Sequence, residues 1–370
     1  MLWLSPWMRP LARVYCEQLQ DAGWEVVLVT TDQHPESDGA RSYERVLDAR
    51  PRTASTWPGF ARELRAARSF VPDVVVTELV RDPRWMLLTG GAPRVNLIHD
   101  DRPHGADEVF PAWERRLFGR WAESAAGTVA FSDYVGERIG ASAVAPLTSD
   151  LDETRVPPLV GAAGRRDFVV FGRLSEYKNL GVTLAAWERH VAGPGWRGDE
   201  LILIGDGDLS PDLLPAVRWR RGRYSYADVL EPMARAKGSV VHYRRATQSG
   251  VQVLAMQLGV TPIVSPEGAL PEFQPPGEDP IGVDDVAGLA RAFDGLADPA
   301  EAERRGRAAH AHYLRVHAAP VSADALGAEL LRAAGKRNTA QHDITHQHDI
   351  THRTRGAGEV EGDGHGGLAS

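Results

Sequence analysis

Two short apolar runs with a helical pattern between them constrain the fold of this chain more than any other feature. Residues 168–171 (FVVF) and 201–204 (LILI) consist of β-branched, aromatic and leucine side chains, as in strands buried on both faces of a sheet. Between the two runs, apolar residues recur at helical spacing, at Leu180, Leu184, Trp187 and Val191. This order predicts a βαβ unit, which requires a parallel sheet covered by helices.

Charged residues and glycines follow both predicted strands. Arg173 and Lys178 come after the first strand and before the helix, and Gly205 and Asp206 follow the second strand. Ligands of open parallel sheets bind at the carboxyl ends of the strands, and a helix start there favours anions. Arg173 can present a planar fork to phosphate, and Lys178 is expected to act as a mobile point charge. Either residue alone would suggest a surface charge, but the two together favour a diphosphate site.

Three motifs in the second half of the chain make a resemblance specific. They are F-G-R-L-S-x-x-K-N, I-G-D-G and G-V-T-P-I-V-S-P-E-G-A-L-P-E, in this order. Together they resemble the carboxyl-terminal domain of retaining glycosyltransferases of family 4, and the resemblance extends more weakly over residues 1–335. It implies the α/β GT-B fold, in which two Rossmann-like α/β/α domains face an interdomain cleft. It also implies transfer of a sugar from a nucleotide diphosphate to an acceptor.

The length of 370 residues is enough for two domains. We expect an N-terminal acceptor-side domain over residues 1–150 and a donor-binding domain over residues 151–335. The second begins with a linker, residues 151–166, that is rich in proline and glycine. Residues 336–370 repeat QHDITH and contain few apolar side chains, which predicts a disordered tail rather than a weak metal site.

Composition excludes several classes of protein. The net charge of −8 argues against a nucleic-acid partner, and the single Cys16 excludes an internal disulfide and fits a reducing cytosol. No apolar run approaches a membrane span, and the N-terminus is too short for a signal peptide. We therefore expect a cytoplasmic protein. Because many members of the family use lipid-linked acceptors, a peripheral contact with the inner membrane face remains compatible with this expectation.

In the first half, strands are predicted at residues 2–5, 24–30, 74–77, 95–98, 128–131 and 143–147, and helices at 11–22, 60–69 and 112–125. Relatives usually carry paired glycines in the first loop, where backbone N–H groups approach the donor phosphate. Here the loop is bulky, SPWMR. Arg9 could contact phosphate through its side chain on the acceptor side, or it could lie on the surface.

His99 follows the strand at residues 95–98 and is itself followed by Asp100 and Asp101. By resemblance, a histidine at this position points into the cleft near the reacting sugar, which makes His99 a candidate catalytic residue. A histidine after a strand is also often an ordinary hydrogen-bonded loop residue. The two aspartates could orient His99 or bind acceptor hydroxyls, and a solvated acidic turn is an equal alternative.

The second half departs from the family at one place. Relatives carry two glutamates eight positions apart, one on the donor sugar and one on the nucleotide ribose. Alignment back from Gly259 places Ala246 and Leu254 there, and a slip of two residues places Gln248 at the first position. A glutamine could hydrogen-bond a hydroxyl but would not stabilise positive charge as a carboxylate does.

The loop after the strand predicted at residues 262–265 supplies the remaining candidates. By resemblance, backbone N–H groups of Gly268 and Ala269 bind the donor, and Glu267 could reach sugar hydroxyls and partly replace the missing glutamate. Helices are predicted at residues 226–236, 284–296, 301–317 and 322–334. The last of these is expected to return to the first domain, as in GT-B proteins.

These observations favour a glycosyltransferase that acts on a glycan, lipid-linked or small-molecule acceptor with a nucleotide-diphosphate sugar as donor. The resemblance implies neither a metal nor a bound cofactor, because the cations neutralise the diphosphate. A non-catalytic GT-B relative that binds a nucleotide or a partner is the main alternative, and a nucleotide-sugar epimerase is a weaker one. A nicotinamide dehydrogenase is disfavoured because no G-x-G-x-x-G follows the first strand.

Overall fold

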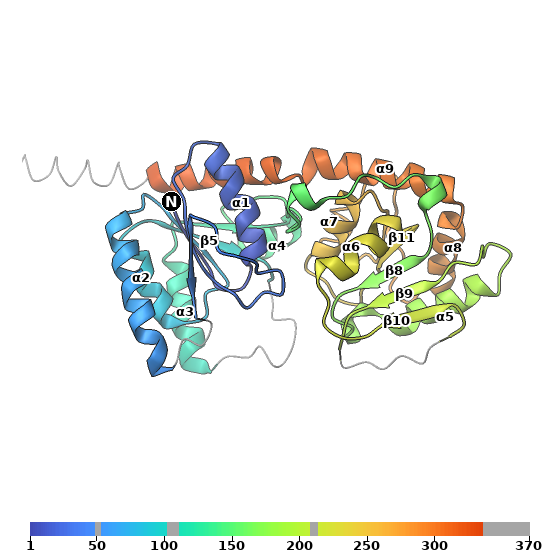
Figure 1. Cartoon of the computed structure of the whole chain (residues 1–370), viewed down its shortest axis with the longest axis horizontal. Helices are drawn as coiled ribbons and strands as arrows, with labels where there is room; N and C mark the ends of the chain where they lie inside the picture. Colours follow the sequence, from blue (N-terminus) through green and yellow to red (C-terminus); the bar gives the residue numbers. More distant parts are fainter. Residues whose placement is uncertain (49–52, 102–110, 208–213, 336–370) are drawn as a thin grey trace, which may run out of the picture.

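The computed structural model describes residues 1–48, 53–101, 111–207 and 214–335, and it contains two parallel β-sheets side by side (Figure 1). The first sheet has seven strands in the order β3-β2-β1-β4-β5-β6-β7, and the second has five in the order β10-β9-β8-β11-β12. Every strand pair is parallel, and helices connect most neighbouring strands. The predicted arrangement of two α/β domains, each built on a parallel sheet, is confirmed.

The strands of the first sheet are short and mostly buried. Their bounds are β1 Leu2–Ser5, β2 Val27–Thr31, β3 Glu44–Leu47, β4 Val75–Glu78, β5 Arg94–Ile98, β6 Gly127–Ala130 and β7 Ala143–Val144. Central strands β1 and β4 have no exposed residue, because helices cover both faces of a parallel sheet. Apolar side chains therefore occupy successive positions rather than alternate ones.

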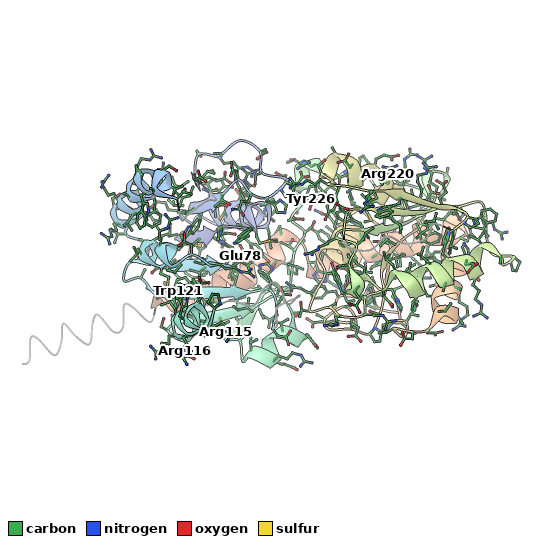
Figure 2. All side chains as sticks on the ribbon, turned by 90° about the horizontal axis from the view of Figure 1, so that it is seen from below. Glu78, Arg115, Arg116, Trp121, Arg220 and Tyr226 are labelled. Atoms are coloured by element: carbon green, nitrogen blue, oxygen red, sulfur yellow. The ribbon has the colours of Figure 1, made fainter. Side chains whose placement is uncertain are left out.

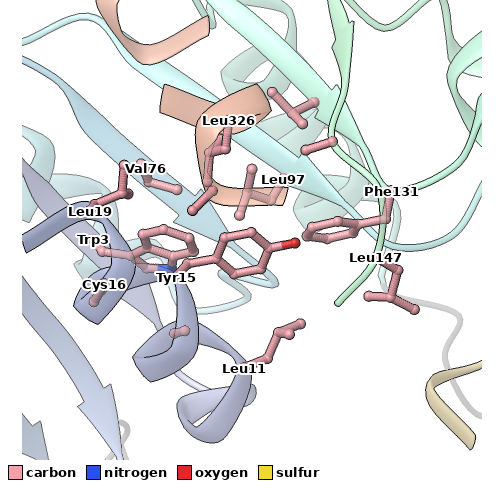
Figure 3. Packing of buried hydrophobic residues seen from close by; sticks show 14 of the residues in the cluster. Trp3, Leu11, Tyr15, Cys16, Leu19, Val76, Leu97, Phe131, Leu147 and Leu326 are labelled. Carbon is pink, nitrogen blue, oxygen red and sulfur yellow. The ribbon is translucent and has the colours of Figure 1, made fainter. Parts of the chain in front are cut away.

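One face of the first sheet is covered by α1 (Arg9–Asp21) and by residues 319–335, which are also helical. Figure 3 shows their shared core, in which Trp3 and Tyr15 stack at 5.7 Å between ring centroids and Leu326 approaches from the last helix. The opposite face is covered by α2 (Trp57–Phe70), the 3-10 segment η2 (Pro83–Thr89) and α3 (Ala112–Glu123). Helix α4 (Asp133–Ile139) joins β6 to β7.

The second sheet is built in the same way. Its strands are β8 Phe168–Phe171, β9 Leu201–Ile204, β10 Val217–Arg220, β11 Gly238–Val241 and β12 Pro262–Val264. Its helices are α5 Leu180–Val191, α6 Tyr226–Arg235, α7 Gly250–Gln257, α8 Val286–Leu296 and α9 Pro299–Val316. The predicted bounds of β8 and β9 are confirmed, because both strands are wholly buried and so carry unbroken apolar runs.

The end of the described chain crosses from the second domain to the first. Helix α9 runs along the second domain, and residues 319–335 continue over the first domain, as the top of Figure 1 shows. Leu326 and Leu330 are fully buried there, and the Tyr15 hydroxyl lies 2.6 Å from the Ser322 hydroxyl. The predicted return of the last helix to the first domain is confirmed. The repeat-rich tail lies outside the described residues.

Some elements were not predicted. Strands β3 (ERVL) and β10 (VRWR) lie at the edges of their sheets, so charged side chains can face outward on them and no apolar run marks them. Helix α4 is short, and its signal is the N-cap Ser132, whose hydroxyl accepts from the Val135 N–H. The second strand begins at Val27 rather than at residue 24, because the helix before it ends in a turn at Gly23.

A buried histidine, His317, lies in the turn between α9 and the helical residues 319–335. The His317 ring lies 4.9 Å from the Phe273 ring and 5.6 Å from the His312 ring, and its Nδ1 donates to the Leu147 carbonyl at 2.9 Å. Burial lowers the pKa of His317 to about 4, although the bond to Leu147 acts in the opposite direction. The neutral ring is thus the form that fits this junction.

We predict that His317 makes the protein acid-sensitive. In the unfolded chain a histidine has a pKa of about 6.5. Between that pH and the lower pKa of the folded state, the unfolded chain binds a proton that the folded protein does not bind. The free energy of unfolding should fall as pH drops from about 6.5 to about 4, by up to ~3 kcal/mol, and this contribution should then level off. Urea unfolding across this range measures it. His317→Asn should flatten the slope, whereas His310→Asn, at a partly exposed site on α9, should not. An unchanged slope in His317→Asn would show that other groups cause the acid sensitivity.

Candidate functional site

The carboxyl ends of the two sheets face each other, and hydrogen bonds connect them directly. After β5, the ring of His99 contacts Gln248, and Asp100 accepts from the Thr247 hydroxyl. Both partners lie between β11 and α7 of the second domain. The Glu272 carboxylate, which follows β12, accepts from the N–H groups of Asp133 and Tyr134 at the start of α4, at 2.7 and 3.1 Å. The predicted ligand edges of both sheets are therefore brought together.

Glycines let the loops at this edge approach closely. Gly172 and Gly205 end β8 and β9 with φ of +110° and +137°, and a Cβ on Gly205 would overlap the Gly172 carbonyl oxygen. Gly268 has φ of +58°, and a Cβ there would overlap the Ala246 carbonyl oxygen. In each case the obstacle is backbone, which cannot move aside as a side chain can. These glycines therefore determine how closely the loops pack at the carboxyl edge of the second sheet.

Of the two predicted phosphate-binding cations, Arg173 is exposed and Lys178 is buried. The Lys178 Nζ donates to the Phe171 carbonyl at 2.9 Å and to the Tyr243 hydroxyl at 2.6 Å, and it lies 4.2 Å from the centre of the Tyr243 ring. Burial lowers the pKa of Lys178, although Tyr177 raises it again in part. The expectation that Lys178 is a mobile charge is therefore wrong, because the ammonium is fixed behind the turn.

The loop after β12 lies beside that turn, but its amides are used differently from the prediction. The Ala269 N–H donates to the Thr247 carbonyl at 3.0 Å, and its side chain is fully buried, so this N–H is not free to bind a donor. The prediction for Ala269 is wrong for this reason. Gly268 and Glu267 are partly exposed on the same loop, next to the segment that carries Gln248.

His99 is held by a residue that the sequence analysis missed. Its Nε2 lies 2.6 Å from a carboxylate oxygen of Glu78, which ends β4 and is fully buried. The indole of Trp3 donates to the other oxygen of Glu78 at 3.4 Å, and the Phe131 ring lies 4.7 Å from the His99 ring. Figure 2 marks Glu78 within the first domain. A signal existed, since Glu78 follows an apolar strand as Arg173 does.

The two aspartates after His99 have separate partners. Asp100 reaches Thr247 of the second domain, and Asp101 lies 3.9 Å from the Arg138 guanidinium on α4. Asp206, at the end of β9, pairs at 3.4 Å with Arg221, which follows β10. The carboxylate of Glu78 bonds the His99 ring directly and therefore orients the histidine.

Arg9 does not lie on the surface, and it does not point its guanidinium to solvent. It is 2% exposed and donates to Glu44 of β3 at 2.6 Å, and Arg13 binds the same carboxylate. Burial alone would raise the pKa of Glu44, but these bonds lower it to about 2. Arg9 therefore stabilises the edge strand β3 and does not take the acceptor-side role predicted for it.

The positions of the family glutamates differ in environment. Leu254 is buried in an apolar cluster under α7, so no polar group takes the place of the second glutamate there. Ala246 is partly buried beside Gly268. Gln248 faces His99 at 3.4 Å, and its Oε1 is buried without a hydrogen-bond partner among the described residues. Of the three, only Gln248 presents a polar group toward the first domain.

Residues 165–298 match the family model described as Glycosyl transferases group 1, a segment that runs from before β8 to the end of α8. No curated protein matches the chain in a sequence comparison. The fold is that of GT-B glycosyltransferase structures. Sucrose-phosphate synthase from Thermosynechococcus elongatus is similar at 18% identity and a TM-score of 0.64, over 90% of this chain and 98% of that one.

Two further solved structures show the same likeness. A UDP-forming α,α-trehalose-phosphate synthase from Burkholderia vietnamiensis has 14% identity and a TM-score of 0.62, over 90% of this chain and 99% of its own. HepE from Anabaena, in complex with UDP and glucose, has 16% identity and a TM-score of 0.60, over 89% of this chain and 98% of its own. At these identities the likeness establishes the fold alone.

Two other features bear on what the site could hold. Within residues 1–48, 53–101, 111–207 and 214–335, no three His, Cys, Asp or Glu side chains are grouped so that they could hold a metal. Over the same residues, no helix is both long and apolar enough to cross a bilayer.

We predict that Gly268→Ala will disturb the site more than a glycine change of equal backbone strain. Gly277→Ala is the matched control, because Gly277 also has a positive φ, +86°, but nothing lies within 4 Å of an added Cβ. The left-handed strain should cost the two variants about 1–2 kcal/mol alike. The overlap with the Ala246 carbonyl should cost Gly268→Ala a further ~1–3 kcal/mol in urea unfolding. Equal destabilisation would show that this approach does not constrain the loop.

Proposed function

We propose that this chain is a glycosyltransferase that moves a hexosyl group from a UDP-sugar to an acceptor hydroxyl, with retention at the anomeric carbon, as in family 4. The observation that carries the proposal is the position of the group 1 segment. Within this segment Gln248 contacts His99 of the first domain, the Gly268 loop lies beside Ala246, and exposed Arg173 follows β8 at the same carboxyl edge of the sheet. The UDP-forming synthase and the UDP complex of HepE among similar structures support UDP as the nucleotide.

In this proposal the diphosphate lies at the end of β8, where Arg173 supplies charge-assisted hydrogen bonds. Lys178 adds positive potential from behind the turn without touching the phosphate, because its Nζ is held by Phe171 and Tyr243. The sugar lies toward His99, Gln248 and Glu267. As the bond from the anomeric carbon to phosphate breaks, negative charge grows on the leaving diphosphate and positive charge on the sugar. The acceptor oxygen then bonds to the anomeric carbon, and its proton passes to the leaving diphosphate, which departs as UDP.

A non-catalytic role is the second candidate, and one observation favours it. Leu254 takes the position of the ribose-binding glutamate and is part of an apolar cluster. A protein of this kind would bind a nucleoside diphosphate and release nothing from any sugar donor. We favour a catalytic role, since the chain has the turn with Arg173 and Lys178 and the close loop contact at Gly268, even though this glutamate is absent. An epimerase has no structural feature in its favour here.

The outer surface of the first domain suggests where an acceptor is presented. Helices α2, η2 and α3 cover the sheet face opposite α1 (Figure 1). Their exposed arginines are Arg62, Arg65, Arg68, Arg115, Arg116 and Arg120, and with exposed Trp57, Leu87 and Trp113 we call this set the basic face. Figure 2 shows Arg115 and Arg116 at the edge of the molecule.

The basic face complements an anionic membrane surface. The whole chain carries a net charge of −8, so this concentration of arginines is local. Among the residues of α2 and α3 that the structure describes, Glu123 is the one exposed acidic residue. Trp57, Leu87 and Trp113 are 51%, 51% and 58% exposed, as suits shallow contact with headgroups. We propose that the protein works in the cytoplasm at the inner membrane face, on a lipid-linked acceptor.

The donor site is tested by Arg173→Ala. Because the change removes a charge-assisted contact worth roughly 1.5–3 kcal/mol, UDP affinity should fall by about 10- to 150-fold, while the protein stays folded. Isothermal titration calorimetry measures the affinity. Arg189→Ala removes an equal charge near the end of α5, at the opposite edge of the same βαβ unit, and should bind UDP as the natural protein does. Unchanged affinity in Arg173→Ala would contradict the assignment of the diphosphate site.

The membrane contact is tested by co-sedimentation with phosphatidylglycerol vesicles and with neutral phosphatidylcholine vesicles. The protein should bind the anionic vesicles, less so at high salt, and Arg115→Glu/Arg116→Glu should lower binding at least about tenfold, since each arginine contributes about 1 kcal/mol. Arg189→Glu/Arg197→Glu, two exposed arginines of the second domain, is the control and should bind normally. Equal binding to neutral vesicles, or RNA binding through the same arginines without vesicle binding, would contradict a membrane partner.

A further inference from the structure

Two glutamates bridge the domains, and each caps a helix of the domain to which it does not belong. Glu36, in the loop after β2, accepts from the Tyr226 N–H at the start of α6 at 2.5 Å. Glu272, in the loop after β12, accepts from the Asp133 and Tyr134 N–H groups at the start of α4, at 2.7 and 3.1 Å. The two interdomain caps are therefore reciprocal, because each domain supplies one carboxylate and one helix start.

The order of the strands places these caps on opposite sides of the candidate site. In the first sheet the caps follow β2 and β6, which are separated by β1, β4 and β5. In the second sheet they follow β10 and β12, the two edge strands. The strands that precede His99 and Arg173 end between them. The site therefore lies between the two caps, and Figure 2 shows Tyr226 where the two domains meet.

The cap at Glu36 is reinforced by the segment that crosses between the domains. Arg155 donates to the second oxygen of Glu36 at 3.2 Å, and its guanidinium lies 5.5 Å from the centre of the Tyr226 ring. The Tyr226 hydroxyl donates to Asp150 in the same crossing segment. The Glu36 side chain is only 12% exposed, so little water reaches its carboxylate. Separation of the domains at this side would break these contacts together.

The capped N–H groups depend on the other domain for their hydrogen bonds. The first N–H groups of an α-helix have no acceptor within that helix. In α4 the Ser132 hydroxyl accepts from Val135 and leaves Asp133 and Tyr134 to Glu272. At the start of α6, Tyr226 likewise donates to Glu36. A carboxylate at a helix start is also favoured by the helix dipole. Opening of the cleft would transfer these N–H groups to water and is therefore opposed by both caps.

We propose that Glu36 and Glu272 are positioning residues that hold the two half-sites against each other, and that UDP enters and leaves when one of these caps breaks. The inference rests on the proposed function for the identity of the ligand, whereas the caps themselves do not depend on it. Because the diphosphate is assigned to Arg173 in the second domain alone, the caps should control the rates of UDP binding and release rather than the affinity.

The positioning role is tested by hydrogen exchange at single backbone N–H groups, read by NMR. Tyr226 should be protected in the natural protein, and Glu36→Ala should accelerate its exchange by about 2- to 30-fold, as expected for loss of a helix cap. Glu36→Gln should restore part of the protection, because an amide oxygen still accepts. Glu231→Ala, which removes an exposed carboxylate of α6, is the control and should exchange normally.

The same experiment applies to the second cap. Glu272→Ala should accelerate exchange at Asp133 and Tyr134, whereas Glu137→Ala, at an exposed position on α4, should not. Fast exchange of the capped N–H groups in the natural protein, or exchange unchanged by loss of both glutamates, would overturn the positioning role.

The effect on the ligand is tested by stopped-flow measurement of UDP binding and release. In Glu36→Ala and in Glu272→Ala both rates should rise by about 2- to 30-fold, with the Kd for UDP unchanged. Unchanged rates, or faster release alone with weaker affinity, would overturn the inference and leave the proposed function intact. Failure of UDP to bind the natural protein would overturn the proposed function and the role in UDP entry, while hydrogen exchange would still decide whether the caps hold the domains together.

Discussion

Packing of the apolar side of helix 319–335 into the core of the first domain determines where the second domain lies. Leu326 and Leu330 join the apolar cluster of Trp3 and Tyr15, and Ser322 bonds the Tyr15 hydroxyl. Because α9 is continuous with this region through the turn at His317, the second domain cannot move without straining a buried junction. The same cluster includes Val253 and Phe273 of the second domain, so the interface is apolar as well as hydrogen-bonded. The contacts of His99 with Gln248 and of Asp100 with Thr247 depend on this constraint.

The parts of the fold that could be predicted from the sequence are those with a local signal. Residues 168–171 and 201–204 were identified with their observed bounds, because a strand buried on both faces must be apolar at successive positions. Edge strands carry no such requirement. In β3, Glu44 is buried only because Arg9 and Arg13 of α1 neutralise it, and that pairing between distant segments cannot be read from either segment alone.

The candidate site follows the same rule. Strand ends with polar residues were located correctly, but their surroundings were not. Lys178 lies at the predicted turn, yet the partner that buries it, Tyr243, is 65 residues away in sequence. Ala269 lies on the predicted loop, yet its N–H is used by Thr247. Glu78 was missed because no resemblance pointed to it, although it is the last residue of β4 and so lies at the same carboxyl edge as His99, which follows β5. The sequence pattern shows at which strand end a residue lies, whereas tertiary contacts decide whether its polar groups are free to bind a ligand.

These contacts give the site a distribution of charge that is consistent with the proposed transfer from a UDP-sugar. Arg173 and, behind it, Lys178 lie at the end of β8, while His99 and Gln248 meet at the junction between the two domains. Carboxylates are present as well, but Glu78 is used to hold His99, and Glu272 caps α4. Of the candidate sugar-contacting residues, Glu267 alone carries a carboxylate, on the partly exposed loop.

The most direct test of this account is the release of UDP from a panel of UDP-sugars by the purified full-length protein, with and without lipid-linked and soluble acceptors. The account predicts that at least one donor and acceptor pair yields UDP and glycosylated product in equal amounts, with the anomeric configuration of the donor retained. Tight binding of UDP with no release from any donor, under conditions in which Arg173→Ala abolishes that binding, would contradict it and identify the protein as a nucleotide-binding relative.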